Sequence, residues 1–91
     1  MTIDEKRSLM KTYFKEQNFS KIFQIGEEVA KSPDAEPFDL LVFANSCMFV
    51  RKYHEAYKWF IALNRHPDAD DINKKAASAA IHALQRFMFP K

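Results

Sequence analysis

The feature that most constrains the fold of this chain is a segment that occurs twice, 34 residues apart. It reads KSPDAE at residues 31–36 and RHPDAD at residues 65–70. The same shift pairs large apolar residues: Leu9 with Phe43, Phe14 with Met48, Phe19 with Tyr53, Phe23 with Tyr57, and Val29 with Leu63. A repeat of this length predicts stacked helical hairpins, in which each unit buries its apolar face against its neighbours. The alternative is an ordinary five-helix bundle in which the repeated turn arose by chance.

Helix signals divide the chain into five helices. We expect them at about residues 3–18, 20–31, 37–51, 53–64 and 71–88. Thr2 and Glu5 form a capping box before the first helix, and Asp70 or Asp71 can cap the fifth, which ends before Pro90. One Gly and four Pro in 91 residues leave little room for a β-fold. The sequence therefore predicts a single all-α domain over residues 1–91.

Charge and hydropathy argue against several classes of partner. The formal net charge is only +2, and pairs such as Lys74 and Lys75 favour solvated faces over a nucleic-acid-binding stripe. The start, MTIDEKRSLM, does not resemble a signal peptide. The apolar run at residues 38–50 is too short to cross a bilayer. Cys47 is the only cysteine, and we expect a buried thiol rather than a disulfide. A cytoplasmic protein without a membrane partner is expected.

Catalytic patterns are equally weak. The three histidines, His54, His66 and His82, lack the spacing of four on one helix that suits a metal site, and no cysteine or carboxylate cluster accompanies them. There is also no glycine-rich phosphate loop and no nucleophile motif. We expect neither an enzyme nor a bound cofactor or metal.

The second unit resembles the tetratricopeptide repeat (TPR) family, most specifically in the segment KYHEAYKWF. The matching positions are Leu40, Phe43, Ala44, Tyr53, Ala56, Phe60 and Pro67, the last of them one residue early. Gly26 and Cys47 depart from the pattern, because the family usually has aromatic residues there. The resemblance implies TPR-like stacked hairpins of about two and a half repeats. The first repeat spans about 3–36, the second about 37–70, and a C-terminal helix about 71–89.

In this family the first helix of each hairpin lines a concave groove. The resemblance therefore places Phe38, Leu41, Met48 and Phe49 on an apolar floor, with Asp4 and Arg7 on the groove face of the first helix. The full set of expected partner-binding residues is Phe14, Phe38, Leu41, Asn45, Met48, Phe49, Lys11, Lys15, Lys75, Ala79 and His82. Exposed apolar patches usually mark interaction sites, and Met and Phe adapt well to an amphipathic helix. The alternative is that the fifth helix covers this floor.

The resemblance also narrows the function. The basic clamp with which some TPR domains hold acidic C-termini of heat-shock chaperones is absent, because those places hold Asp4 and Ser8, Phe38 and Val42, and Ile72 and Ala76. By size and groove character the chain looks like the small TPR chaperones of bacterial type III secretion. These shield an amphipathic helix of the self-assembling needle subunit, alongside a second small co-chaperone. The alternative is a scaffold or adaptor in a stable complex.

Overall fold

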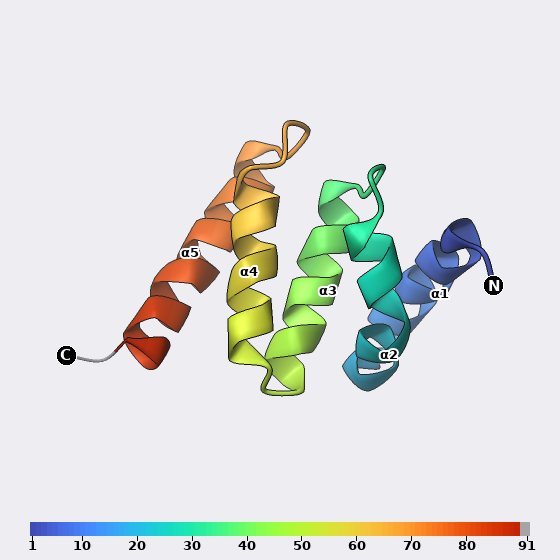
Figure 1. Cartoon of the computed structure of the whole chain (residues 1–91), viewed down its shortest axis with the longest axis horizontal. Coiled ribbons are helices and arrows are strands. Elements are labelled where there is room, and N and C mark those ends of the chain that lie inside the picture. Colours follow the sequence, from blue (N-terminus) through green and yellow to red (C-terminus); the bar gives the residue numbers. More distant parts are fainter. Residues whose placement is uncertain (90–91) are drawn as a thin grey trace.

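The computed structural model describes residues 1–89, and this part of the chain is helical without any strand. Its helices are α1 (Ile3–Lys15), α2 (Phe19–Lys31), α3 (Pro37–Phe49), α4 (Tyr53–Asn64) and α5 (Asp71–Met88). Each helix packs mainly against its neighbours in sequence, so that the hairpins stack side by side in a body of 44 × 27 × 20 Å (Figure 1). The expected all-α, TPR-like stack of five helices is confirmed.

The 34-residue repeat is visible in the backbone of the two hairpin turns. Gln17 and Arg51 are the only non-glycine residues with positive φ in the described part of the chain, at 56° and 64°. The residue after each donates a 2.8 Å hydrogen bond back across the helix end, from Asn18 N–H to Tyr13 O and from Lys52 N–H to Cys47 O. This Schellman pattern closes a helix. The predicted ends near residues 18 and 51 were therefore too late, since α1 ends at Lys15 and α3 at Phe49.

The helix starts follow the expected capping chemistry. Thr2 and Glu5 form the predicted capping box, and Asp70 Oδ1 accepts a 2.8 Å hydrogen bond from the Asn73 N–H at the start of α5. Each of these side chains satisfies a backbone donor that has no partner within the helix. Pro90, which we expected to follow the end of α5, lies outside the described residues.

The two Pro-Asp-Ala turns are joined directly by His66. Its Nε2 lies 2.7 Å from the Ala35 carbonyl oxygen, and its Nδ1 accepts a 3.0 Å hydrogen bond from the Asp68 N–H. Because Nδ1 accepts, the proton of the neutral ring is on Nε2, which donates to Ala35. One repeat is thus tied to the next at the turn.

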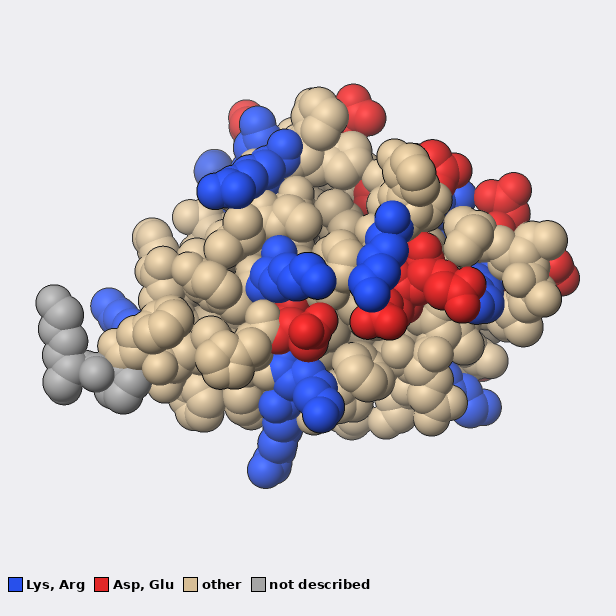
Figure 2. Space-filling model, in the orientation of Figure 1, with Lys and Arg blue, Asp and Glu red and all other residues tan. Residues whose placement is uncertain are grey.

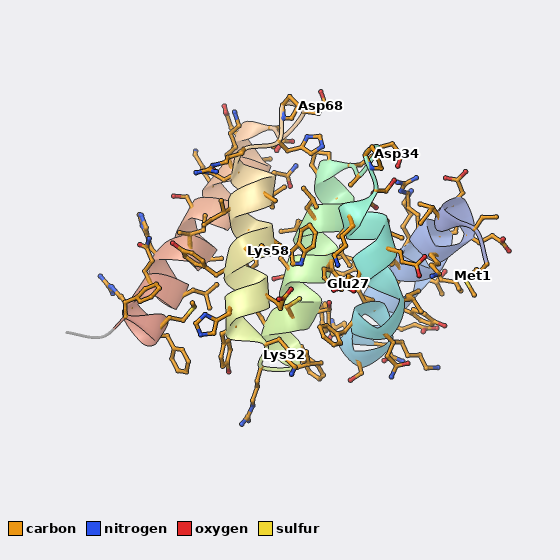
Figure 3. The ribbon with its side chains drawn as sticks, in the orientation of Figure 1. Met1, Glu27, Asp34, Lys52, Lys58 and Asp68 are labelled. Atoms are coloured by element: carbon orange, nitrogen blue, oxygen red, sulfur yellow. The ribbon has the colours of Figure 1, made fainter. Side chains whose placement is uncertain are left out.

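The face that Figure 1 presents to the reader carries charges of both signs. Figure 2 shows Lys, Arg, Asp and Glu interspersed over it. Glu27 on α2 and Lys58 on α4 lie on this face (Figure 3) and are exposed. Such mixed charge is typical of a solvated surface. Within residues 1–89, none of the helices combines the length and hydropathy needed to traverse a bilayer.

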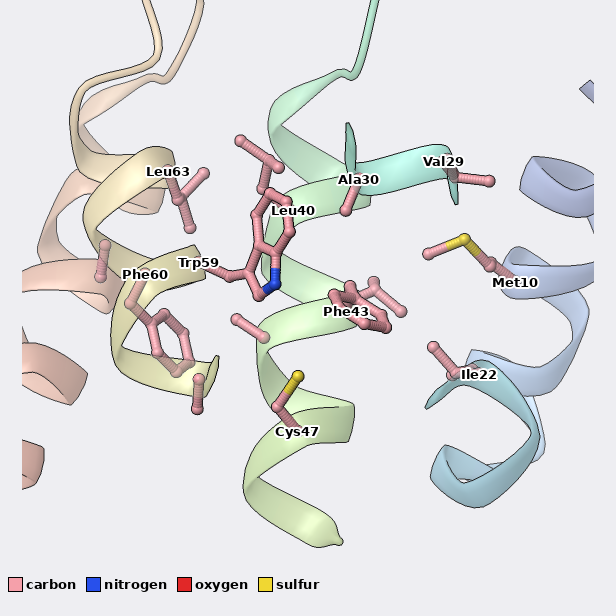
Figure 4. Packing of buried hydrophobic residues seen from close by; sticks show 14 of the residues in the cluster. Met10, Ile22, Val29, Ala30, Leu40, Phe43, Cys47, Trp59, Phe60 and Leu63 are labelled. Carbon is pink, nitrogen blue, oxygen red and sulfur yellow. The ribbon is translucent and has the colours of Figure 1, made fainter. Parts of the chain in front are cut away.

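Phe43 of α3 connects the two halves of the core. Its ring stacks on Phe23 of α2 at 5.8 Å and meets the edge of Trp59 of α4 at the same distance. Figure 4 shows Phe43 between Met10 and Ile22 on one side and Trp59 on the other. Phe43 is 2% exposed. α3 is apolar on nearly every side. It also has neighbours on most sides, which accounts for much of this composition.

Gly26 shows why the chain departs from the TPR pattern at this position. A Cβ added there would lie 2.7 Å from Phe43 Cδ1, so any side chain would collide with the central ring. One repeat later the sizes are exchanged, because the positions equivalent to Gly26 and Phe43 are Phe60 and Ala77. Both of these are buried. The large residue of the pair is Phe43 in one repeat and Phe60 in the next, each facing a small residue. A pair of one large and one small residue therefore fills a similar volume in both repeats.

Candidate binding face on α1, α3 and α5

The part of α3 that its neighbours leave uncovered is apolar. Phe38, Leu41 and Met48 are half-buried and pack against the edge of the core, and Asn45 is also half-buried. Phe49 is 60% exposed. The alternative that α5 covers this floor does not describe the structure, since α5 contacts α3 only sparsely. The surface is therefore open to another molecule.

Four phenylalanines form a continuous row along this surface, which we call the phenylalanine row. Phe38 contacts Phe14 with ring centroids 5.7 Å apart. Phe14 contacts Phe19 at 6.1 Å, and Phe19 contacts Phe49 at 5.7 Å. The row runs from the first turn of α3 to its last residue, by way of the end of α1 and the start of α2. Three of its members were predicted as partner-binding residues.

Phe19 is the member that sequence reasoning missed. It was aligned with Tyr53 as the first large residue of a second helix, which in this fold belongs to the outer layer. The tight turn at Gln17 instead brings Phe19 against the end of α1. The sequence did contain a signal for this contact, because Phe19 comes directly after the turn and only five residues after Phe14.

The predicted basic residues flank the row on one side only. Lys11 and Lys15 lie on α1, are exposed and form no ion pair with any described residue. Lys75, Ala79 and His82 lie on α5 and are also exposed. They are separate from the row, which is built by α1, α2 and α3. The structure thus gathers Phe14, Phe38 and Phe49, but not the α5 residues predicted with them.

The α5 residues lie on a surface of their own. Ile72, Ala76, Ala79, Ala83 and Phe87 recur at intervals of three and four, and all five are exposed. Ile72 and Phe87 are 78% and 65% exposed. This spacing places them along one side of the helix. The small side chains in the middle leave room for close approach of a second helix.

Arg7 has a structural role that the sequence did not reveal. Its Nε donates to Asp39 Oδ2 at 2.9 Å, and its two terminal nitrogens lie 3.1 Å from Asp4 Oδ1 and 3.4 Å from Asp34 Oδ1. Burial alone would lower the pKa of Arg7, but the Asp39 and Asp34 carboxylates outweigh it and raise that pKa. Arg7 therefore joins α1 to α3 and to the turn before it, and it is not free for a partner.

Cys47 is placed as expected for a structural thiol. Its side chain is fully buried in α3. Burial raises the pKa of the Cys47 thiol to about 12. The thiolate that reacts with electrophiles is therefore scarce at neutral pH.

The larger hollows in the described part of the chain include two that lie away from the phenylalanine row. A cleft of about 600 Å³ lies between the two Pro-Asp-Ala turns, with Leu40, Trp59 and His66 in its wall. A smaller hollow of about 290 Å³ lies between the α3–α4 turn and the end of α5, lined by Lys52, Tyr53 and Phe87 among others. Within the described residues, no group of three or more His, Cys, Asp and Glu side chains is arranged to hold a metal ion.

Together, the stacked hairpins and the phenylalanine row define an all-α scaffold with a partly exposed apolar surface. Comparisons of the chain with protein-family models, with curated proteins and with solved structures found no match.

Proposed function

We propose that this chain is a non-enzymatic protein-binding module that holds an amphipathic helix of a partner against the phenylalanine row. The observation that carries the proposal is the row itself, an unbroken line of aromatic contacts that ends in a 60% exposed Phe49. Phenyl rings in a row present a shallow apolar surface, which fits the apolar side of a helix with anchors at intervals of three and four.

The energetic argument is that this surface gains by being covered. Full burial of one phenyl side chain contributes about 1.5–3 kcal/mol relative to leaving it in water. Phe14 and Phe49 retain 37% and 60% of their exposure, so a partner gains part of that amount at each ring. Leu41 and Met48 extend the same surface, and the exposed Lys11 and Lys15 beside it would attract an acidic flank.

As a more specific proposal, the partner is the self-assembling needle subunit of a bacterial type III secretion system. In that role the module would act in the cytoplasm as a chaperone, together with a second small co-chaperone. Covering the helix through which the subunit polymerises would prevent assembly before secretion. The support is the all-α stack of helical hairpins and its apolar rather than basic binding face.

A second candidate, a scaffold or adaptor in a permanent complex, is favoured by one separate observation. Phe87 and Phe89 at the end of α5 are 65% and 61% exposed and contact Tyr53 and Tyr57, away from the row. A second exposed aromatic surface suits a subunit that contacts two partners at once.

Co-purification from the native host tests the proposal, with Phe49→Glu as the variant and Phe87→Glu as its matched control. Both positions are similarly exposed, so neither change should unfold the chain. We expect the unaltered chain and Phe87→Glu to retain a partner that Phe49→Glu loses. Mass spectrometry that identifies a secreted, self-polymerising protein supports the chaperone, whereas a permanent subunit lost in Phe87→Glu supports the scaffold. Retention of every partner by Phe49→Glu would show that the row is not the binding surface.

A further inference from the structure

The two ends of the helix stack differ in charge. One end holds the start of α1 and the two Pro-Asp-Ala turns; the other holds the two hairpin turns and the end of α5 (Figure 1). Residues 1–7, 31–39 and 65–75 at the first end contain eight Asp and Glu against six Lys and Arg. Residues 14–21, 49–55 and 85–89 at the second end contain two Asp and Glu against five Lys and Arg. We call these the acidic end and the basic end.

The figures show where these charges lie. Asp34 and Asp68 lie at the upper end of the molecule, and Lys52 lies at the lower end (Figure 3). In Figure 2 the charged side chains that project from the lower edge are basic, whereas both acidic and basic ones project from the upper edge. The small net charge of +2 conceals this asymmetry, because the two ends nearly cancel.

The phenylalanine row runs from one end to the other. Phe38 lies in the first turn of α3, at the acidic end, and Phe49 is its last residue, at the basic end. Three basic residues lie near Phe49 in the sequence or in the fold, namely Lys15, Arg51 and Lys52. All three are exposed and form no ion pair with any described residue. At the opposite end, the acidic residues near Phe38 are Asp4, Asp34 and Asp39, and all three pair with Arg7. A helix in this row therefore meets unpaired positive charge at the Phe49 end only.

We propose that the partner helix has an acidic end, and that charge fixes its direction, with this acidic end at the basic end of the stack. This inference rests on the proposed function and specifies the chemistry of the partner. The apolar row alone does not distinguish the two directions, because phenyl rings line it from end to end. Full side-chain charges outweigh the half charges at helix termini, so direction follows the charged flanks of the partner.

The direction can be measured by cross-linking with two designed peptides as probes. Each is an amphipathic helix of about 18 residues with leucines at helical spacing. One has glutamates in its first turn and lysines in its last, and the other has these charges exchanged. Each has a cysteine at its N-terminus. The domain receives one new cysteine, either Lys15→Cys at the basic end or Asp4→Cys at the acidic end, where Arg7 links Asp4 to Asp39 beside Phe38. The buried Cys47 does not compete.

The peptide with the acidic N-terminus should form its disulfide with Lys15→Cys about tenfold faster than with Asp4→Cys, and the charge-exchanged peptide should show the reverse preference. In 0.5 M salt both preferences should shrink several-fold, because screening shortens the range of the charges to a few ångströms. Because the result is a ratio between the two ends, a difference in intrinsic helicity between the peptides does not affect it.

Charge variants of the domain provide the matched control. Arg51→Glu with Lys52→Glu should remove most of the preference, whereas Lys58→Glu, an exposed change on the α2/α4 face, should leave it intact. If both peptides place the same terminus at the same end, shape rather than charge fixes the direction, and this inference is wrong while the proposed function stands. If both peptides bind but neither prefers one end, this inference is again wrong while the proposed function stands. If neither peptide binds, the proposed function fails and this inference fails with it.

Discussion

α1 and α5, at the two edges of the stack, are attached to the middle by different kinds of contact. Arg7 and Lys6 fix α1 through ion pairs with Asp39 and Glu28, both at 2.9 Å. Every ion pair in the described chain lies within residues 4–39. α5 is held by buried Ala77 and Leu84, by aromatic contacts near its end and by one side-chain hydrogen bond.

The difference shows that equivalent helices of a repeat need not be stabilised in the same way. α1, α3 and α5 occupy equivalent places, but only α3 has neighbours on both sides. α1 compensates for its exposed edge with charged contacts to a turn, and α5 with a longer helix and aromatic contacts. The first kind of contact responds to pH and salt, whereas the second responds to loss of apolar area.

The largest effect should come from removing the main apolar anchor of α5. Leu84 is 2% exposed, and Leu84→Ala should lower the free energy of unfolding by about 3 kcal/mol, through lost burial and a cavity. Amide hydrogen exchange should show that α5 loses protection before α1 and α2. Equal loss of protection in α1 would contradict the division of the stack into two differently held edges.

Arg7→Met should have the next largest effect, at the opposite edge. It leaves the Asp39 carboxylate, only 1% exposed, without its cation. Because the Glu36 N–H still donates to that carboxylate, we expect a loss of about 2–3 kcal/mol, below the usual cost of breaking a fully buried pair. Urea unfolding measures the loss. Adding Asp39→Asn to Arg7→Met should recover part of the lost stability. If none is recovered, the methylene groups of Arg7, and not its charge, hold α1.

Gly26→Ala should destabilise the junction between the two edges by a smaller amount. Alanine favours helix by about 1 kcal/mol over glycine, but its Cβ would meet the Phe43 ring at 2.7 Å. Overpacking of this kind costs about 1–3 kcal/mol, so we expect a net loss of about 1 kcal/mol in thermal unfolding. The second change Phe43→Leu should make Gly26→Ala less harmful. A stabilised single variant would show that the ring moves aside freely.

The smallest effect should be the response to acid. Hydrogen bonds from Thr2, Lys6 and Ser32 lower the pKa of Glu5, Glu28 and Asp34, respectively. A carboxylate with a lowered folded-state pKa contributes stability above its unfolded pKa and loses it as pH falls through the folded value. Since all three are solvent-exposed, the change should be slight. As pH falls from 7 to 3, the protection factors of backbone amides, which are corrected for the pH dependence of intrinsic exchange, should fall in α1 and α2 first. An earlier fall in α5 would contradict the comparison.

The sequence was sufficient for the architecture but not for its local details. The repeated turn and the apolar spacing predicted five helices and their pairing, because both depend on patterns that recur along the chain. The ends of α1 and α3 were missed, since Gln17 and Arg51 adopt a left-handed conformation that neither residue type indicates. For the same reason Phe19 was not expected in the row.

The residues of the candidate site were easiest to predict where one helix supplies them. The spacing on α3 places Phe38, Leu41, Met48 and Phe49 on one side of that helix, and the structure leaves them partly or largely exposed. The role of Arg7 could not be read from the sequence, because it depends on carboxylates up to 32 residues away that the fold brings together. Whether these residues bind a partner stays a prediction.

The most direct test of the central claim is photo-cross-linking in the native host. Phe49 is replaced by p-benzoylphenylalanine, and Lys58, exposed on the α2/α4 face, is replaced in the same way as the control. If the phenylalanine row holds a partner helix, position 49 should give a cross-linked product with one other protein, and position 58 should not. Cross-linking of that partner from position 58 but not from position 49 would contradict the account.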